Sequence, residues 1–385
     1  MNNRRRILLV SWGLPPAAAG SPVIVGNLAR AFTRDEMVLA GEQPDARLSD
    51  SWDPAWPELI AVESPWARLR HCRRQARLLG VPWMAARLTR LIRERNCTDV
   101  LAVYPDEAYL WAALKASGRT GCRFYPYFHN TYKESSKDWR LRLANWLQPR
   151  VFSAAHHVFV MSEGMVELYR DRYPALTRCS AMVHSFAEDV PSYAEPGPFD
   201  EGVFALSGNI NPACLDAARR VSQAVARVAG ARLQFYTRQS QQELEELGVW
   251  NAAARCTGLA RADLLQALRR AEVVLLPHGF NGVFGAVEYQ TIFPTRTIEY
   301  LICGRPILAH SPPGVFVTRF LKKHDCALVV EAAELQAVRE GLERLRNDAA
   351  LQARLVRNAV ETAKMFHISR VGAHLREVLG MPAAA

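Results

Sequence analysis

The sequence predicts an α/β protein made of two similar domains, each with a parallel sheet covered by helices on both faces. Strand-like apolar runs alternate with helix-like stretches along the whole chain, which is the pattern of parallel sheets. A chain of 385 residues with 49% apolar residues is too long for one ordinary domain and can fill two cores. A strand, a glycine-bearing loop and a helix follow one another twice, starting near residues 7 and 203.

In the first half, the predicted strands are short buried runs that end in polar or glycine-bearing loops. The charged start and the apolar run Ile7 to Val10 have the order of a signal peptide, but the run is short and Pro15-Pro16 breaks it, so we expect a first strand. The other strands expected here are 37–40, 99–104, 123–128, 157–161 and 179–184. Helices are expected at 106–117, 138–152 and 163–173. Residues 41–65 are predicted to be a polar excursion without a strand.

A stretch rich in proline, glycine and acidic residues, 187–201, separates the two halves. Pro212 is expected at the first position of a helix, which proline favours. Residues 278–292 are glycine-rich and aromatic without helical period, and they predict a loop. Further strands are expected at 203–206, 233–236, 254–257 and 273–277, with a helix at 262–271 and three helical stretches after Val330.

The segment 293–310, FPTRTIEYLICGRPILAH, predicts a loop, a short helix and a buried strand. Pro294 and Thr295 have the chemistry of a helix start. Arg296 and Glu299 share one helix face. A cation and free backbone N–H groups at a helix start beside the carboxyl edge of a parallel sheet suit a phosphate. The alternative is an ordinary surface Arg–Glu pair, which contributes little to stability.

This segment resembles the donor-site helix of the retaining glycosyltransferases of family 4, where many members have Pro-Ser/Thr-Lys-x-x-Glu-Tyr-Leu-Ala-x-Gly-x-Pro-Val. The loop 11–21 resembles the family's Pro-Pro-x-x-Gly-Gly/Ser loop. His129, directly after a predicted strand, matches a histidine that members carry near the anomeric carbon. The resemblance covers nearly the whole chain, and its most specific residues follow residue 203.

The resemblance implies the GT-B fold, in which two Rossmann-like domains face each other across a cleft and a C-terminal helix crosses back. It divides the chain into an acceptor-side domain (1–190), a nucleotide-sugar-binding domain (191–365) and a C-terminal helix that packs on domain one (366–385).

The implied activity is transfer of a sugar from a nucleotide diphosphate sugar to a hydroxyl of a glycan or lipid-linked acceptor, with retention of the anomeric configuration. The resemblance assigns catalytic roles to His129 and Arg296. It assigns donor binding to Gly20, Ser21, Gly208, Asn209, Phe293, Pro294, Thr295 and Glu299. We expect no metal and no other cofactor, because the chemistry needs none and the sequence has no Asp-x-Asp motif.

Two departures from the family pattern leave other functions open. Thr291 stands where many members have the first glutamate of Glu-x7-Glu, and Asn209 and Asn211 stand where members often have Arg and Lys. A basic adaptor that kept the fold but lost catalysis would suit both departures. A nucleotide-sugar epimerase shares the architecture and would make product from the donor alone.

The net charge of +10 is concentrated in the segment 66–95, where nine arginines are opposed locally only by Glu94 and alternate with apolar residues. This basic amphipathic pattern suits an anionic membrane surface, and a solvated arginine-rich face is the alternative. No nucleic-acid-binding motif accompanies the charge, so we expect no nucleic-acid partner. Eight scattered cysteines without a C-x-x-C pair predict a reduced, cytoplasmic chain. If the basic segment binds anionic lipid, the chain would be peripheral on the inner face of the membrane.

Overall fold

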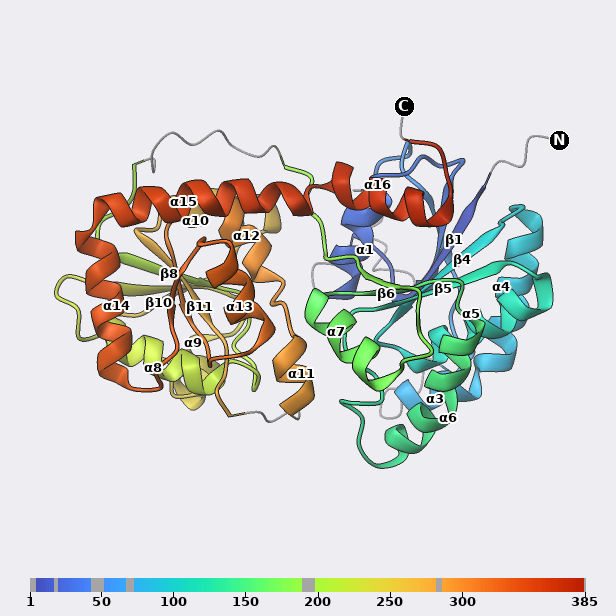
Figure 1. Ribbon diagram of the computed structural model, residues 1–385, viewed down its shortest axis with the longest axis horizontal. Coiled ribbons are helices and arrows are strands. Elements are labelled where there is room, and N and C mark those ends of the chain that lie inside the picture. The colour runs from blue at the N-terminus through green and yellow to red at the C-terminus, as the bar shows by residue number, and fades with distance from the viewer. Residues whose placement is uncertain are drawn as a thin grey trace. The chain divides into compact units, whose positions relative to one another are not determined.

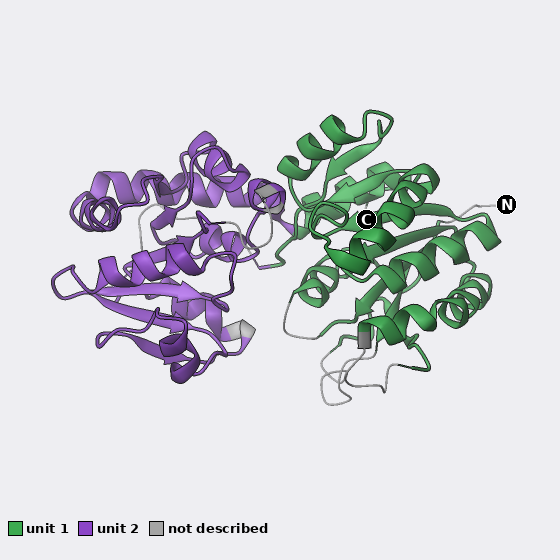
Figure 2. Cartoon of the chain, turned by 90° about the horizontal axis from the view of Figure 1, so that it is seen from below, with its two compact units in different colours: residues 1–187, 368–385 green, residues 188–367 purple. Residues whose placement is uncertain are grey.

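The computed structural model describes residues 5–16, 20–42, 52–66, 73–188, 198–281 and 286–383. The chain divides into two compact units (Figure 2): residues 1–187 with 368–385, called unit 1, and residues 188–367, called unit 2. Each unit is built around one parallel sheet, as the sequence predicted. Within the described residues, no helix has both the length and the apolar character needed to cross a membrane.

Unit 1 has a seven-stranded parallel sheet in the order β3-β2-β1-β4-β5-β6-β7. Figure 1 labels four of its strands, β1, β4, β5 and β6. Its strands are β1 (Ile7–Gly13), β2 (Met37–Glu42), β3 (Glu58–Ala61), β4 (Asp99–Tyr104), β5 (Arg123–Phe128), β6 (Val158–Val160) and β7 (Cys179–Ala181). Its helices are α1 (Ser21–Ala29), α3 (Arg73–Leu79), α4 (Val81–Glu94), α5 (Glu107–Thr120), α6 (Asp138–Ala154), α7 (Glu163–Arg172) and α16 (Ile368–Leu379). The four central strands are apolar along nearly their whole length and buried, because helices cover both faces of the sheet.

The C-terminal helix α16 packs against α1 in unit 1, which confirms the expected crossing helix. Arg376 holds it in place: the guanidinium pairs with Glu36 at 2.8 Å and lies 4.6 Å from the ring centroid of Phe32. The backbone N–H of Ile368 also donates to Phe186 at 2.9 Å. The hydrogen bonds from Arg376 lower the pKa of Glu36 to about 2, so this carboxylate is ionised at neutral pH.

Unit 2 has a six-stranded parallel sheet in the order β10-β9-β8-β11-β12-β13. Its strands are β8 (Val203–Ser207), β9 (Arg232–Tyr236), β10 (Arg255–Thr257), β11 (Val273–Pro277), β12 (Ile307–His310) and β13 (Leu328–Val330). Its helices are α8 (Leu215–Val225), α9 (Gln241–Glu246), α10 (Arg261–Arg269), α11 (Ala286–Thr291), α12 (Arg296–Ile302), α13 (Phe316–Lys323), α14 (Leu335–Asn347) and α15 (Ala349–Ala363), followed by the 3-10 turn η2 (Lys364–Phe366).

Three local predictions were wrong. The polar excursion contains the edge strand β3, whose residues are only partly buried and therefore lack a strong apolar pattern. The predicted loop 278–292 ends in the short helix α11, while 282–285 lie outside the described residues. Pro212 lies in a turn, because α8 starts only at Leu215.

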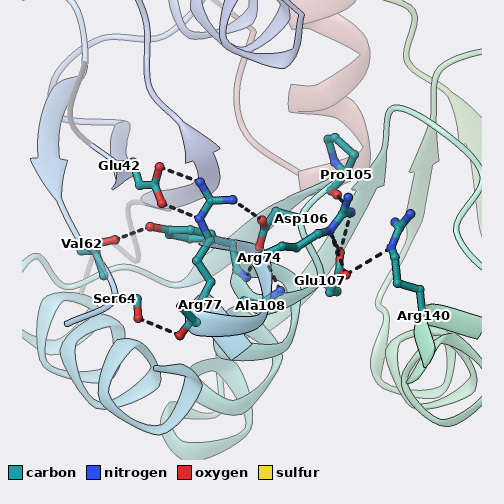
Figure 3. Close-up of polar contacts among 12 residues, drawn as sticks. Glu42, Val62, Ser64, Arg74, Arg77, Pro105, Asp106, Glu107, Ala108 and Arg140 are labelled. Atoms are coloured by element: carbon teal, nitrogen blue, oxygen red, sulfur yellow. Dashed lines mark hydrogen bonds and ion pairs between the residues drawn. The ribbon is translucent and has the colours of Figure 1, made fainter. Parts of the chain in front are cut away.

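The basic segment 66–95 is only partly a solvated face, because acids from other parts of the chain neutralise three of its arginines. Arg77 pairs with Glu42 at 2.5 Å and with Asp106 at 3.0 Å (Figure 3). Arg95 pairs with Glu58 at 2.9 Å. A count of neighbouring charges in the sequence could not find these partners, since they lie 29 or more residues away.

The third neutralised arginine, Arg74, binds Glu107, whose carboxylate is fully buried. Arg74 donates to both carboxylate oxygens, at 2.7 to 3.0 Å, and to the backbone oxygen of Pro105 at 2.9 Å (Figure 3). Arg140 of α6 approaches the same carboxylate at 3.4 Å. A buried carboxylate needs such charged partners, so Arg74 joins α3, and Arg140 joins α6, to the start of α5 past the carboxyl end of β4. Residues 67–72 of the segment lie outside the described residues.

Candidate functional site

Each sheet reverses its strand order beside its first strand. In unit 1, β1 lies between β2 and β4, and in unit 2, β8 lies between β9 and β11. Ligands of open parallel sheets bind at such switch points, past the carboxyl ends of the strands. The residues predicted for the site fall beside both switch points: Ser21 begins the helix after β1, and Gly208 follows β8 directly.

In unit 2, Arg296 lies directly against the loop that follows β8. Its Nη2 donates to the backbone oxygen of Asn209 at 2.9 Å. Gly208 has a φ of +78°, a conformation that glycine adopts without strain, and its N–H donates to Tyr236 at 2.9 Å. A Cβ at Gly208 would lie 3.7 Å from Nη2 of Arg296, an ordinary van der Waals contact, so the positive φ and not the space explains the glycine.

The second terminal nitrogen of Arg296, Nη1, is buried and has no hydrogen-bond partner among the described residues. A buried cationic donor without a partner is unfavourable, and an anionic oxygen would satisfy it with a charge-assisted hydrogen bond. Arg296 therefore combines a fixed position with one unused donor beside the switch point of unit 2.

Tyr300 is a residue of this site that the sequence analysis did not assign. Its buried hydroxyl accepts a 2.8 Å hydrogen bond from the backbone N–H of Ser207, the last residue of β8. Burial raises the pKa of Tyr300, so the phenol stays protonated. The signal was present, because Tyr300 is four residues after Arg296 on the same helix face. Two side chains of α12 thus contact this region: Tyr300 bonds to the end of β8, and Arg296 bonds to the loop that follows it.

The same loop is also fixed to the residues that follow β9. Gln239 accepts a hydrogen bond from the N–H of Ile210 at 2.6 Å and donates to the oxygen of the same residue at 3.2 Å. The Thr237 hydroxyl donates to the side-chain oxygen of Asn209 at 2.9 Å. Asn209 is therefore held by Thr237 through its side chain and by Arg296 through its backbone.

The other predicted donor residues of this segment differ in where they lie. The ring of Phe293 is buried against Phe316, Phe320 and Phe366, with the nearest ring centroid, that of Phe320, 4.9 Å away. Its side chain is thus part of the core of unit 2.

The helix start expected at Pro294 and Thr295 is confirmed, because α12 begins at Arg296 with Thr295 at its N-cap position. Thr295 has helical backbone angles, however, and makes no side-chain capping hydrogen bond. Pro294 and Glu299 are half-buried, and the backbone oxygen of Pro294 accepts from Thr297 at 2.9 Å. Thr291, at the place of the family glutamate, is buried in α11 and donates to Val287 of its own helix at 3.3 Å.

A second loop at this edge, after β11, is held by side chains that the sequence analysis missed. Asp216 accepts from the N–H of Phe280 at 3.0 Å and pairs with Arg220 at 3.0 Å. Nε of Arg220 donates to Nε2 of His310 at 2.8 Å, and Nδ1 of His310 lies 3.1 Å from the oxygen of Val330. Burial lowers the pKa of His310 to about 4, which keeps the ring neutral and able to accept from Arg220. The i,i+4 spacing of Asp216 and Arg220 was the available signal.

In unit 1, the structure brings together two of the predicted residues. Nδ1 of His129 lies 2.8 Å from Oγ of Ser21, which begins α1. Gly20, just before it, has a φ of +60°. His129 follows the carboxyl end of β5, and its ring meets Tyr127 edge-on at 4.4 Å between centroids.

The other ring nitrogen of His129, Nε2, is buried and lacks a hydrogen-bond partner among the described residues. Burial lowers the pKa of His129 to about 3, and the nearby His184 adds to the shift. The imidazole is therefore neutral at physiological pH and can exchange a hydrogen bond with a polar ligand through Nε2.

We find no candidate metal-binding site in the part of the chain that is described. No group of three or more His, Cys, Asp or Glu side chains there is placed to hold a metal ion.

Comparison with solved structures places the fold in the GT-B class of glycosyltransferases. Sucrose-phosphate synthase from Thermosynechococcus elongatus is similar over 98% of each chain, with a TM-score of 0.76 and 16% identity. HepE of Anabaena, in complex with UDP and glucose, covers 98% of this chain and 99% of its own, with a TM-score of 0.72 and 14% identity. A putative UDP-N-acetylglucosamine 2-epimerase from Listeria monocytogenes has a TM-score of 0.62 and 10% identity over 98% of this chain and 97% of its own.

The family resemblance is confirmed within the first unit, where residues 19–180 match the sequence profile of Glycosyltransferase Family 4. This match lies in the N-terminal half of the chain. The motif around Arg296, on which most of the resemblance was based, lies in the C-terminal half. No curated protein sequence matches the chain. At these low identities the structural neighbours establish the fold, and the chemistry of this chain has to be argued from its own residues.

Proposed function

We propose that the protein is a retaining glycosyltransferase, which moves a sugar from a nucleotide diphosphate sugar to a hydroxyl of a glycan or lipid-linked acceptor. The observation that carries the proposal is Arg296, whose Nη2 donates to the loop after β8 while its buried Nη1 has no hydrogen-bond partner among the described residues. The match to the family over residues 19–180 supports the same reaction class.

In this reaction the bond between sugar C1 and the β-phosphate oxygen breaks, and a bond from C1 to the acceptor oxygen forms. Negative charge grows on the leaving diphosphate, while the acceptor proton is released. Arg296 stabilises that charge through Nη1, because a preorganised cation needs no rearrangement during the reaction. A fixed guanidinium can take the part that a metal ion has elsewhere, so the proposal includes no metal.

His129 acts as a neutral hydrogen-bonding group at the sugar. Its low pKa excludes a role as a permanent cation, and Ser21 fixes the ring through Nδ1 so that Nε2 remains for a sugar hydroxyl. Glu299 binds the ribose hydroxyls, as the family resemblance implies. Gly208 and Asn209 line the diphosphate beside Arg296, and Gly20 lies at the start of the α1 helix in unit 1.

The proposal extends to the donor and the compartment. HepE was solved with UDP and glucose, and this supports uridine nucleotides as the first donors to test. The seven described cysteines are all free, which supports a reducing, cytoplasmic location.

The test is to incubate the purified chain with UDP-, GDP-, ADP- and dTDP-sugars, with and without a mixed glycan and lipid extract, and to follow nucleoside diphosphate release. A transferase releases the diphosphate in step with acceptor glycosylation, and proton NMR of the product should show the donor's anomeric configuration. An inverted product would contradict the retaining mechanism.

Two other outcomes would replace the proposal. An isomerised nucleotide sugar formed without acceptor would identify an epimerase, a class that the neighbour from Listeria keeps in view. If the chain shows neither turnover nor nucleotide binding, the adaptor becomes the favoured function. Thr291 and Asn209 are then the decisive departures from the family pattern.

A further inference from the structure

One face of unit 1 exposes an unusual number of large apolar side chains. Eight such side chains are exposed among the described residues, and six of them belong to unit 1. All six lie either in the crossover between β3 and β4 or on α6. They are Trp66, Leu79, Trp83, Trp139, Leu141 and Trp146.

Sheet topology puts these two crossovers on the same face. The connections from β3 to β4, β4 to β5 and β5 to β6 all move in one direction along the sheet, so right-handed crossovers place α4, α5 and α6 on one side. The connection from β1 to β2 moves the other way and places α1 on the opposite side. Packing agrees, because α5 contacts both α4 and α6 while α16 contacts α1 (Figure 1).

The apolar side chains of this face are continuous across the helices. Trp146 of α6 meets Trp111 of α5 edge-on, with 5.0 Å between ring centroids. Cations stack on both rings: Lys115 lies 5.5 Å from the centroid of Trp111, and Arg150 lies 4.4 Å from that of Trp146. Aromatic rings flanked by long cationic side chains are typical of surfaces that lie at the boundary between water and lipid.

The exposed charge of the same helices is strongly positive. All residues of α4, α5 and α6 are described, and their exposed acids are Glu94 and Asp138, while Glu107 is buried and paired. The exposed cations of the face, including Lys137 just before α6, are Arg87, Arg90, Arg93, Lys115, Arg119, Lys137, Arg142 and Arg150. The solvent side of the three helices thus carries a net charge of +5 (seven cations and two acids), and Lys137 adds one more positive charge.

We propose that this face of unit 1, made by α4, α5 and α6, docks on an anionic lipid bilayer. The charge is complementary to anionic headgroups, and Trp83, Trp139 and Leu141 supply the apolar contacts that a soluble polyanion would not need. Both features are required, because neither a few charges nor a few apolar side chains alone give stable binding.

The surface differs from the basic segment expected from the sequence. Arg74, Arg77 and Arg95 are used inside unit 1, whereas α6, outside that segment, contributes three of the exposed tryptophans and leucines. The starts of α4 and α6 follow the carboxyl edge of the sheet, which is also the edge of His129. Docking would therefore keep that edge near a membrane-bound acceptor, although binding itself does not depend on the proposed transfer reaction.

The test is co-sedimentation of the full chain with vesicles, without any donor. Vesicles of phosphatidylcholine containing about one third phosphatidylglycerol should bind the protein, and pure phosphatidylcholine should bind it at least about tenfold less. Binding should fall at high salt, because screening shortens the range of the attraction. Tryptophan emission should shift to the blue when the exposed rings enter the lipid boundary.

Two double variants separate the contributions. Arg87→Glu with Arg142→Glu should weaken binding at least about tenfold, since each charge near the surface contributes severalfold. Trp83→Ser with Trp139→Ser should reduce the blue shift, to which Trp66 and Trp146 still contribute, and should also weaken binding. The matched control is Arg227→Glu with Arg357→Glu, which makes the same charge change at exposed positions of unit 2 and should bind like the wild type.

Three results would overturn the proposal, provided that circular dichroism shows folded variants. The first is no binding to the anionic vesicles. The second is equal loss in the control, which would mean that net charge alone acts. The third is loss in the arginine variant but none in the tryptophan variant, which would show that the apolar side chains do not contact lipid and that the face attracts polyanions by charge alone.

Discussion

The guanidinium of Arg296 donates a 2.9 Å hydrogen bond to the backbone oxygen of Asn209, a residue 87 positions earlier in the chain. This contact joins α12 to the loop after β8, and it leaves Nη1 of Arg296 buried without a hydrogen-bond partner in the described part of the chain. A buried donor without a partner lowers the stability of the free protein, and an anion bound at Nη1 would recover that free energy. That exchange is the physical basis of the proposed donor site.

Tyr300→Phe should destabilise the protein, because it leaves the buried N–H of Ser207 without its 2.8 Å acceptor. We expect a loss of about 1 to 3 kcal/mol in the free energy of unfolding, measured by urea denaturation. Tyr236→Phe is the matched control, since no described residue hydrogen-bonds its half-buried hydroxyl. An equal loss in both variants would show that the Ser207 contact contributes nothing specific.

Gly208→Ala should reduce stability by about 1 to 2 kcal/mol, because alanine is strained at a φ of +78°. Nucleotide affinity should fall as well, because backbone strain at residue 208 disturbs the loop whose Asn209 oxygen accepts from Arg296. Gly118→Ala in α5 is the control: nothing lies within 4 Å and its φ is not positive, so helix propensity should stabilise the protein. Unchanged melting of the Gly208 variant would argue against this loop geometry.

Arg77→Ala should destabilise unit 1 far more than Arg90→Ala, although each arginine pairs with a glutamate at 2.5 Å. The first substitution removes the partner of Glu42 and of the nearly buried Asp106, and we expect a loss of about 2 to 4 kcal/mol. The second affects a pair in open solvent, where screening leaves no measurable change. Thermal denaturation of both variants compares them, and similar melting temperatures would contradict the burial of the Arg77 network.

The ion pair between Glu36 and Arg376 should make the anchoring of α16 sensitive to acid. The pKa of Glu36 is lowered from 4.5 to about 2, so the stabilisation is fully present above about pH 5 and is lost as the pH falls toward 2. The urea midpoint of Glu36→Gln should lie below that of the wild type at pH 7, and the difference should shrink steadily between pH 5 and 3. A difference independent of pH would mean that the carboxylate's charge is not involved.

Several of these relationships could be predicted from the sequence and others could not. Arg296 and Gly208 were each identified by a local motif, and their contact follows from the parallel topology of unit 2. Tyr300 was visible on the helix but had no recognisable partner, because its acceptor role depends on a backbone N–H in β8. Local patterns thus found the residues, whereas their partners required the fold.

The charge pattern of the sequence predicted the surroundings of the arginines poorly. The arginines at 74 and 77 looked solvated because their acids, Glu107 and Glu42, lie in other segments. The edge strand β3 was missed for a related reason, since only one side of an edge strand is paired and its residues are half-buried. Long-range pairing and edge position leave no periodic signal in a single sequence.

The most direct measurement is calorimetric titration of the wild type and Arg296→Ala with UDP, followed by GDP, ADP and dTDP. We predict that one nucleoside diphosphate binds the wild type and that Arg296→Ala weakens it at least about tenfold, or about 1.4 kcal/mol, because a charge-assisted contact to phosphate is lost. Arg227→Ala, at an exposed arginine past α8, should bind as the wild type does. Equal affinities in the wild type and the Arg296 variant, or no binding of any of the four, would contradict the assignment of the donor site.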